Sequence, residues 1–158
     1  CAVGTVGIRY TPSKGGPTDE VYGFDDGAIH DALSRSDYVV VACPLTDRTR
    51  GLLGAAEFAT LPPGAVVVNA ARGAIVDTEA LVAALRSNGI RGAALDVTDP
   101  EPLPEGHPLW TLENCLITPH TGGYTPKHWE RLADVVAENV ERLDAGAELV
   151  NEVRPPES

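Results

Sequence analysis

The chain has 158 residues and a formal net charge of −11 at pH 7, with 43% hydrophobic and 22% charged residues. This charge repels phosphate backbones and anionic lipid surfaces, so nucleic acid and membranes are excluded as expected partners. The composition fits one globular core of ordinary size and excludes a disordered or collagen-like chain. No apolar run reaches the roughly 18 to 20 residues of a membrane span, and no signal peptide precedes the first expected strand, so we expect a cytoplasmic protein.

Lysine is nearly absent: of 12 basic residues, only Lys14 and Lys127 are lysines. An acidic, lysine-poor surface is typical of proteins that work in high salt, and equally of acidic proteins from high-GC genomes. Composition leaves both explanations open.

The three cysteines, Cys1, Cys43 and Cys115, are odd in number and widely spaced, without a C-x-x-C pair. This pattern predicts neither a zinc site nor a disulfide framework, and we expect no metal. Cys43 has no histidine or other base near it in the sequence, which disfavours a role as a nucleophile.

Short apolar runs alternate with longer amphipathic segments, the pattern of βαβ units around a parallel sheet. The runs within 38–42 and 65–69 are apolar without alternation, as expected for strands that helices cover on both faces. An acidic or threonine cap near Asp77 and a stop at Asn88-Gly89 bound the best-defined helix. The predicted strands are 5–9, 38–42, 65–69, 92–96 and 114–118, and the predicted helices are 26–35, 54–60, 77–88 and 126–145.

The first residues predict a nucleotide-binding fold that lacks its first strand. Residues 1–4 look like the last turn of a helix closed by Gly4, which would make 5–9 the second strand of a nucleotide-binding fold. Gly4 to Gly7 does not satisfy the phosphate-loop pattern G-x-G-x-x-G. We therefore expect an α/β, doubly wound, Rossmann-like parallel sheet, truncated at its N-terminus. A natural truncated product, a proteolytic fragment and a deliberately shortened chain all fit this expectation.

Three chemically distinctive residues each follow a predicted strand: Arg72, Glu101 and His120. Parallel strands bind ligands at their carboxyl ends, so the three side chains are expected to converge. The Arg72 guanidinium suits a carboxylate, the His120 imidazole delivers a proton near neutral pH, and the Glu101 carboxylate orients and stabilises an imidazolium. The sequence thus predicts a site that holds and protonates a small 2-keto acid.

The phrases that carry these residues, N-x-x-R-G at 69–73, D-V-x-x-x-E-P at 96–102 and P-H-x-x-G at 119–123, resemble those of the D-isomer-specific 2-hydroxyacid dehydrogenases. The resemblance extends from about residue 5 to the C-terminus. It implies that Arg72 binds substrate, that Glu101 pairs with His120, and that His120 is the acid-base residue. His30, His107 and His128 fall in helical or loop-packing stretches and are not expected to act in the reaction.

The same resemblance implies a set of cofactor contacts. Asp96 would lie near the nicotinamide carboxamide, and Cys43, which precedes Pro44, would contact the coenzyme. Together with the adenosine-side candidates below, the expected cofactor-binding residues are Arg9, Thr11, Cys43, Pro44, Ala70, Arg72, Asp96, His120 and Gly122.

Arg9 bears on the choice of cofactor. The residue that ends the second strand of a nucleotide-binding fold faces the adenosine ribose, where NAD requires a hydrogen-bond acceptor. Arg9 cannot accept, but it can pair with a 2′-phosphate, with hydroxyls from Thr11 and Ser13 and a second charge from Lys14. We therefore expect NADP(H), while NAD(H) stays open because an arginine at a strand end can also point into solvent.

These expectations combine into a partial coenzyme-binding domain over 1–147, with a tail over 148–158 leading toward a substrate domain. The parent would be a homodimer that transfers hydride between NADPH and a 2-keto acid such as glyoxylate or hydroxypyruvate, and the isolated chain would be inactive. Phosphoglycerate dehydrogenase is an alternative that Arg9 disfavours. Formate dehydrogenases of this family carry glutamine in place of Glu101, which disfavours that activity here. A further alternative is a non-catalytic, corepressor-like protein that senses the dinucleotide.

Overall fold

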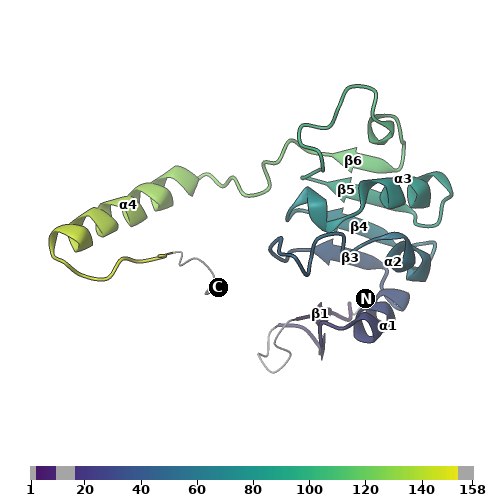
Figure 1. The fold of residues 1–158 in the computed structure, drawn as a ribbon, viewed down its shortest axis with the longest axis horizontal. Helices are drawn as coiled ribbons and strands as arrows, with labels where there is room; N and C mark the ends of the chain where they lie inside the picture. The colour runs from purple at the N-terminus through teal and green to yellow at the C-terminus, as the bar shows by residue number, and fades with distance from the viewer. Residues whose placement is uncertain (1–2, 10–16, 153–158) are drawn as a thin grey trace. The chain divides into compact units, whose positions relative to one another are not determined.

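Two compact units make up the chain, residues 1–122 and 123–158, in a computed structural model that describes residues 3–9 and 17–152. The first unit consists of parallel strands flanked by helices (Figure 1). This arrangement confirms the predicted Rossmann-like α/β fold. The expected division at residue 147 remains a prediction about domain roles.

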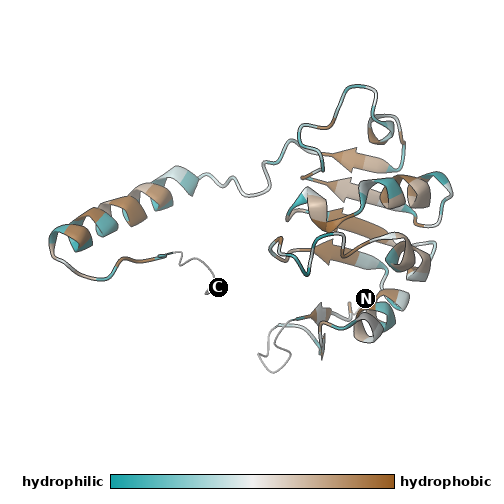
Figure 2. Cartoon of the chain, viewed as in Figure 1, coloured by the Kyte–Doolittle hydropathy of each residue, from teal (hydrophilic) through white to brown (hydrophobic). Residues whose placement is uncertain are grey.

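The strands of the first unit form two parallel sheets. The larger one orders its four strands as they occur in the sequence, β3-β4-β5-β6, and the smaller pairs β1 with β2. Hydrophobic residues dominate the strands of the larger sheet (Figure 2). The strands are β1 (Val6–Ile8), β2 (Glu20–Tyr22), β3 (Tyr38–Val41), β4 (Val66–Asn69), β5 (Gly92–Leu95) and β6 (Cys115–Ile117).

The strand β2 was not predicted, because it has three residues and follows a polar stretch rich in glycine and proline. Asp19 fixes its register against β1. One carboxylate oxygen of Asp19 accepts hydrogen bonds from the backbone N–H of Thr5 at 2.7 Å and from the Thr5 hydroxyl at 2.8 Å. A side-chain contact thus begins a pairing that hydrophobic periodicity does not encode.

All four predicted helices are present, with ends shifted by one or two residues. Aspartates cap two of them: Asp25 accepts from the backbone N–H of Ala28, and Asp77 accepts from that of Ala80. Asn88 ends the third helix in a left-handed conformation, φ 54°, which confirms the predicted stop. The helices are α1 (Asp26–Ser34), α2 (Ala55–Thr60), α3 (Thr78–Arg86) and α4 (His128–Asp144), with short 3₁₀ turns at η1 (Gly73–Ile75) and η2 (Pro108–Trp110).

One face of the larger sheet packs against α1, α2 and α3 to form the core. Val67 is fully buried at its centre, and Leu33 and Leu85 reach it from the helices with 2% exposure each. Burial alternates along β3 and β4, so the residues between these core positions point to the other face.

No described helix of the first unit covers that second face. Its side chains Tyr38, Val40 and Leu116 are 64%, 65% and 63% exposed. Helices were expected to cover both faces of the strand at 38–42, but within residues 17–122 they cover only one. The side chains of this apolar run point alternately to both faces, and only one face contributes to the core.

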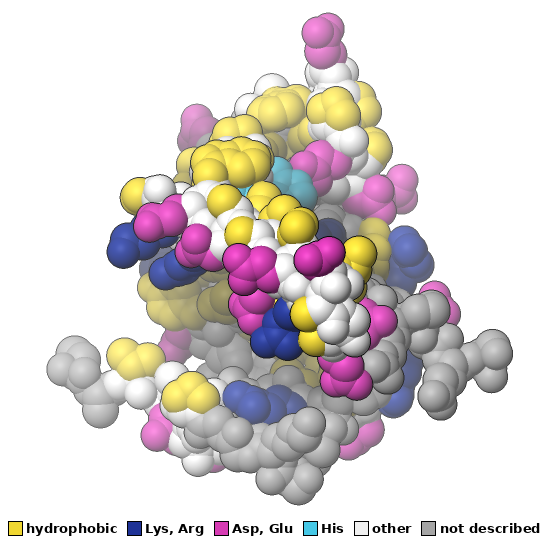
Figure 3. All heavy atoms as spheres, turned by 90° about the vertical axis from the view of Figure 1, so that its left-hand side faces the viewer, with side chains coloured by type: hydrophobic (Ala, Val, Ile, Leu, Met, Phe, Trp, Pro, Cys, Tyr) yellow, Lys and Arg dark blue, Asp and Glu magenta, His cyan; other side chains and the backbone are white. Residues whose placement is uncertain are grey.

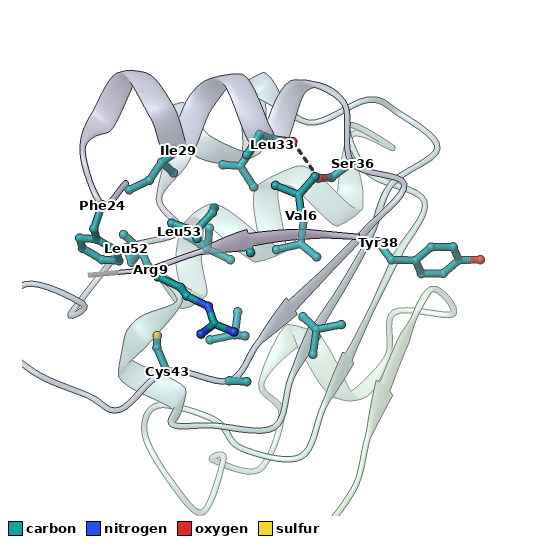
Figure 4. Close-up of a pocket in the computed structure, with 17 residues that line it drawn as sticks. Val6, Arg9, Phe24, Ile29, Leu33, Ser36, Tyr38, Cys43, Leu52 and Leu53 are labelled. Atoms are coloured by element: carbon teal, nitrogen blue, oxygen red, sulfur yellow. Dashed lines mark hydrogen bonds between the residues drawn. The ribbon is translucent and has the colours of Figure 1, made fainter. Parts of the chain in front are cut away.

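A cavity of about 470 Å³ separates the two sheets. Its walls are the facing edges of β1 and β3, and α1 closes one side through Ile29 and Leu33 (Figure 4). In the strand order common to doubly wound folds, the first strand lies between the second and the fourth strands, which correspond to β1 and β3 here. Among the described residues, no strand pairs with β1 and β3 at that point.

The second unit is built around α4, which has no buried residue among those described. The tail folds back onto the helix, where Asn139 exchanges hydrogen bonds with the backbone of Val150 at 2.8 and 3.1 Å. Figure 3 shows hydrophobic side chains, in yellow, at the surface that faces the viewer. The helix carries five large exposed apolar side chains: Trp129, Leu132, Val136, Val140 and Leu143. Within the described residues, no helix combines the length and apolarity needed to cross a membrane.

The two faces of the sheet lead to a stability prediction. Val67→Ala, in the buried face, should lower the free energy of unfolding of the first unit by about 2 to 3 kcal/mol, from lost burial and a residual cavity. Val40→Ala, in the open face, should lower it by less than about 1 kcal/mol. Urea unfolding followed by circular dichroism measures both values, and equal losses would contradict the assignment of the faces.

Candidate active site

The carboxyl ends of β4, β5 and β6 lie side by side in register. The backbone N–H of Asp96 donates to the carbonyl of Asn69 at 2.9 Å, and that of Thr118 donates to the carbonyl of Leu95 at 2.9 Å. Each strand is followed within a few residues by one of the predicted catalytic residues. The sheet therefore delivers these segments to a single edge, as the sequence analysis expected.

His120 and Glu101 are in direct contact. The Nδ1 atom of the imidazole lies 2.7 Å from a carboxylate oxygen of Glu101, and the two side chains are 45% and 42% exposed. Because a carboxylate only accepts, Nδ1 must donate this hydrogen bond. The arrangement leaves Nε2 to exchange protons, and no described residue is hydrogen-bonded to it. At this exposure the ion pair contributes little stability, so its value lies in orientation.

The imidazole is carried by a tight turn in which His120 adopts φ 54°, a left-handed conformation that costs a non-glycine residue about 1 to 2 kcal/mol. Asp96 holds the turn. One of its oxygens accepts from the Thr118 hydroxyl at 2.6 Å and the Thr121 N–H at 3.1 Å, and the other accepts from the Gly122 N–H at 2.8 Å. The bonds from Thr118, and then those from the two amides, lower the pKa of Asp96.

Arg72 sits at the end of a turn built by the buried residue Asn69, which is 1% exposed. The side-chain N–H of Asn69 donates to the carbonyl of Arg72 at 3.0 Å, and its oxygen accepts from the N–H of Ala71 at 3.0 Å. The guanidinium is exposed and donates to the carbonyl of Ala71 at 2.6 Å. Among the described residues, no hydrogen bond or ion pair joins it to Glu101 or His120.

Gly73 links the arginine turn to the segment that carries Glu101. A Cβ on Gly73 would lie 2.0 Å from the carbonyl oxygen of Thr98, so only glycine permits this approach. The hydroxyl of Thr78 also donates to the carbonyl of Asp99 at 2.9 Å. Asn69, Gly73 and Thr78 were not predicted as supporting residues, although the N-x-x-R-G phrase contains the first two of them.

The adenosine-side candidates lie at the cavity between the sheets. Arg9 follows β1 and extends toward Cys43 in Figure 4, and both residues line the cavity. Burial raises the pKa of the Cys43 thiol, which keeps it protonated and supports a lining role rather than a nucleophilic one. Thr11, Ser13 and Lys14 lie outside the described residues.

The remaining candidates occupy turns at the same edge. The buried hydroxyl of Thr49 donates to the carbonyl of Pro44 at 2.7 Å and so shapes the turn after Cys43. Ala70 is exposed directly after β4, and Gly122 contacts Asp96 through its amide. Within residues 3–9 and 17–152, no cluster of three metal-ligating side chains occurs.

Another histidine makes a similar pair away from this edge. His30 on α1 lies 2.9 Å from Glu57 on α2 through Nε2, and its Nδ1 is 3.4 Å from the hydroxyl of Thr60. Both ring nitrogens of His30 therefore have partners. This distinguishes a helix-to-helix link from the His120 pair, whose Nε2 has no partner among the described residues.

Residues 2–122 match the family model for the D-isomer specific 2-hydroxyacid dehydrogenase NAD binding domain. This match is to a class of dinucleotide-binding domains that share the parallel α/β fold seen here. The chain belongs to the D-isomer-specific 2-hydroxyacid dehydrogenase family.

Similar proteins with known names include a reductase and two dehydrogenases. The chain is 40% identical over 133 residues to a glyoxylate reductase of Aeropyrum pernix (84% of this chain, 40% of the relative) and 38% identical over 128 residues to a D-3-phosphoglycerate dehydrogenase of Methanocaldococcus jannaschii (81% and 24%). A D-isomer specific 2-hydroxyacid dehydrogenase of Xanthobacter autotrophicus Py2, solved in complex with NADPH and MES, matches with 41% identity and a TM-score of 0.81 (95% of this chain, 60% of that chain). The chain thus spans less than half the length of these two named relatives.

The close approach at Gly73 leads to a prediction. Gly73→Ala should lower the free energy of unfolding by about 1 to 3 kcal/mol, because the methyl group forces the 98–101 segment away from the arginine turn. Gly64→Ala is the matched control, since a Cβ there meets nothing within 4 Å. Its unfolding free energy should be unchanged or slightly raised. Chemical unfolding measures both, and a tolerated Gly73→Ala would contradict the packing described.

Proposed function

We propose that the whole protein containing this chain transfers hydride between a nicotinamide dinucleotide and a small 2-keto or 2-hydroxy acid such as glyoxylate or hydroxypyruvate. The observation that carries the proposal is the 2.7 Å pair of His120 and Glu101, placed at the same sheet edge as Arg72. Family membership and the 40% identity to a glyoxylate reductase support it.

His120 is the proton donor in this proposal. Its Nδ1–H is held by Glu101, so the proton that reaches the substrate carbonyl oxygen leaves from Nε2. The Glu101 carboxylate holds the ring nitrogen on the far side from the substrate and so fixes the plane of the ring. In the direction of alcohol oxidation, the same Nε2 accepts the proton.

Arg72 binds the substrate carboxylate in this proposal. Its guanidinium is exposed at the end of a turn fixed by Asn69, and its planar donors match two carboxylate oxygens at once. Holding the carboxylate orients the neighbouring carbonyl toward His120, which removes a large entropic part of the barrier.

The residues present fit the two ends of a nicotinamide dinucleotide. Arg9 follows β1 and Cys43 lies two residues beyond β3, at the carboxyl ends of strands where a dinucleotide binds in this fold, while Asp96 and Ala70 follow β5 and β4 at the catalytic edge. The bound cofactor supplies the hydride. The sequence of this chain contains no G-x-G-x-x-G phrase. The pyrophosphate of the cofactor would therefore need hydrogen-bond donors from elsewhere in the whole protein.

NADP(H) is the cofactor we propose, with NAD(H) as the alternative. Arg9 stands where an NAD enzyme requires an acceptor, and the Xanthobacter relative is described with NADPH. Phosphoglycerate dehydrogenase is the second candidate activity, favoured by the 38% identity to that enzyme from M. jannaschii and disfavoured by Arg9. Residues 1–147 as a partial coenzyme-binding domain and a homodimeric parent remain part of the proposal.

The catalytic assignment is tested in the whole protein with glyoxylate as substrate. His120→Ala should lower kcat by about 10² to 10⁴, because it removes the proton donor. His30→Ala is the matched control: it deletes a histidine that also contacts a glutamate, and kcat should be unchanged. A fully active His120→Ala enzyme would refute the assignment.

Cofactor choice is tested by exchanging Arg9. The unmodified protein should prefer NADPH over NADH by at least about tenfold in kcat/KM, which is roughly 1.4 kcal/mol, an amount one charge-assisted hydrogen bond supplies. Arg9→Asp should reverse the preference, since a carboxylate repels the 2′-phosphate and accepts from free ribose hydroxyls. Steady-state kinetics with both cofactors measure the ratio. Equal use of both by the unmodified protein would overturn the proposal for NADP(H).

A further inference from the structure

We propose that Asp96 is a positioning residue for His120, holding the 118–122 turn in the conformation that directs the imidazole at Glu101. The inference rests on the proposed function for its catalytic meaning, and on the hydrogen bonds of the turn for its structural meaning. The position of Asp96 in the sheet is the first observation that supports this role. Asp96 follows β5 directly, between the strand ends that carry the arginine and histidine turns.

The bonds to Asp96 enclose His120 on both sides. Thr118 binds the carboxylate two residues before His120, and Thr121 and Gly122 bind it one and two residues after. The only backbone hydrogen bond of His120 itself in the described structure runs from its N–H to the carbonyl of Thr118 at 3.0 Å. The left-handed φ of His120 is therefore maintained from a neighbouring strand rather than by a continuing helix or sheet.

Gly122 is fitted to this arrangement. A Cβ at Gly122 would lie 2.8 Å from a carboxylate oxygen of Asp96, so a side chain there would displace the carboxylate. A glycine at this position lets the amide reach its acceptor at 2.8 Å. The hydrogen bond from Gly122 to Asp96 therefore depends on the absence of a side chain at residue 122.

This role is compatible with a contact to the cofactor. A carboxylate offers about four acceptor sites, and the turn occupies three of them. The remaining site on the oxygen bound to Gly122 can accept one further donor, such as an amide N–H₂. Positioning His120 and receiving a nicotinamide carboxamide are consequently separate tasks with separate experimental signatures.

The test uses Asp96→Asn in the whole protein, with two readouts. Amide hydrogen exchange at Thr121 and Gly122 should become faster by at least about tenfold, because the amide group replaces an acceptor oxygen with a donor. With glyoxylate at saturating cofactor, kcat should fall by about 10- to 100-fold through misplacement of the imidazole, in addition to any change in the KM for the cofactor. Asp37→Asn, at the opposite edge of the sheet, is the control that should leave both readouts unchanged.

Thr118 provides an independent pair of variants that leave the carboxylate in place. Thr118→Val removes the 2.6 Å hydroxyl donor and should shift exchange and kcat in the same direction but less, whereas Thr118→Ser should restore both. This pair decides the question if Asp96→Asn does not fold. Unchanged exchange with a raised cofactor KM would overturn the proposal in favour of a cofactor contact alone. An inactive unmodified protein would contradict the proposed function, and the exchange data would still test the turn.

Discussion

The parallel register of β4, β5 and β6 is the constraint on which the site depends. Because the three strands end together, short segments of three to six residues are enough to bring an arginine, a carboxylate and an imidazole to one edge. The core beneath them, with Val67 fully buried and Ile75 and Ile90 fully enclosed, fixes the strand positions. The chemistry is therefore located by packing far more than by local turn propensity.

Much of this arrangement was predictable from the sequence. Hydrophobic periodicity located five of the six described strands, and the Asp77 cap and Asn88 stop bounded α3, because each depends on one or two residues in a local pattern. The contact between His120 and Glu101 followed from strand order and the family phrases. These features share a property: neighbouring residues or strand periodicity determine them.

The features that escaped prediction depend on backbone atoms far apart in the chain. Nothing near Gly73 in the sequence shows that the carbonyl of Thr98 packs against it, and nothing near Asp96 shows that its oxygens meet the amides of Thr121 and Gly122. The strand β2 escaped for the same reason, since Asp19 sets its register across a polar stretch. The sequence shows that a glycine or an aspartate is present, but only the folded backbone determines which atoms that residue contacts.

The placement of the site residues on different strands has a consequence for how the domain can vary. Arg9, the proposed determinant of cofactor choice, follows β1, whereas the proposed catalytic residues follow β4, β5 and β6. A substitution at Arg9 therefore leaves unchanged the sequence of the turns that carry Arg72, Glu101 and His120. Dinucleotide preference and proton transfer would thereby be encoded in separate segments of the chain, which selection or engineering can change one at a time.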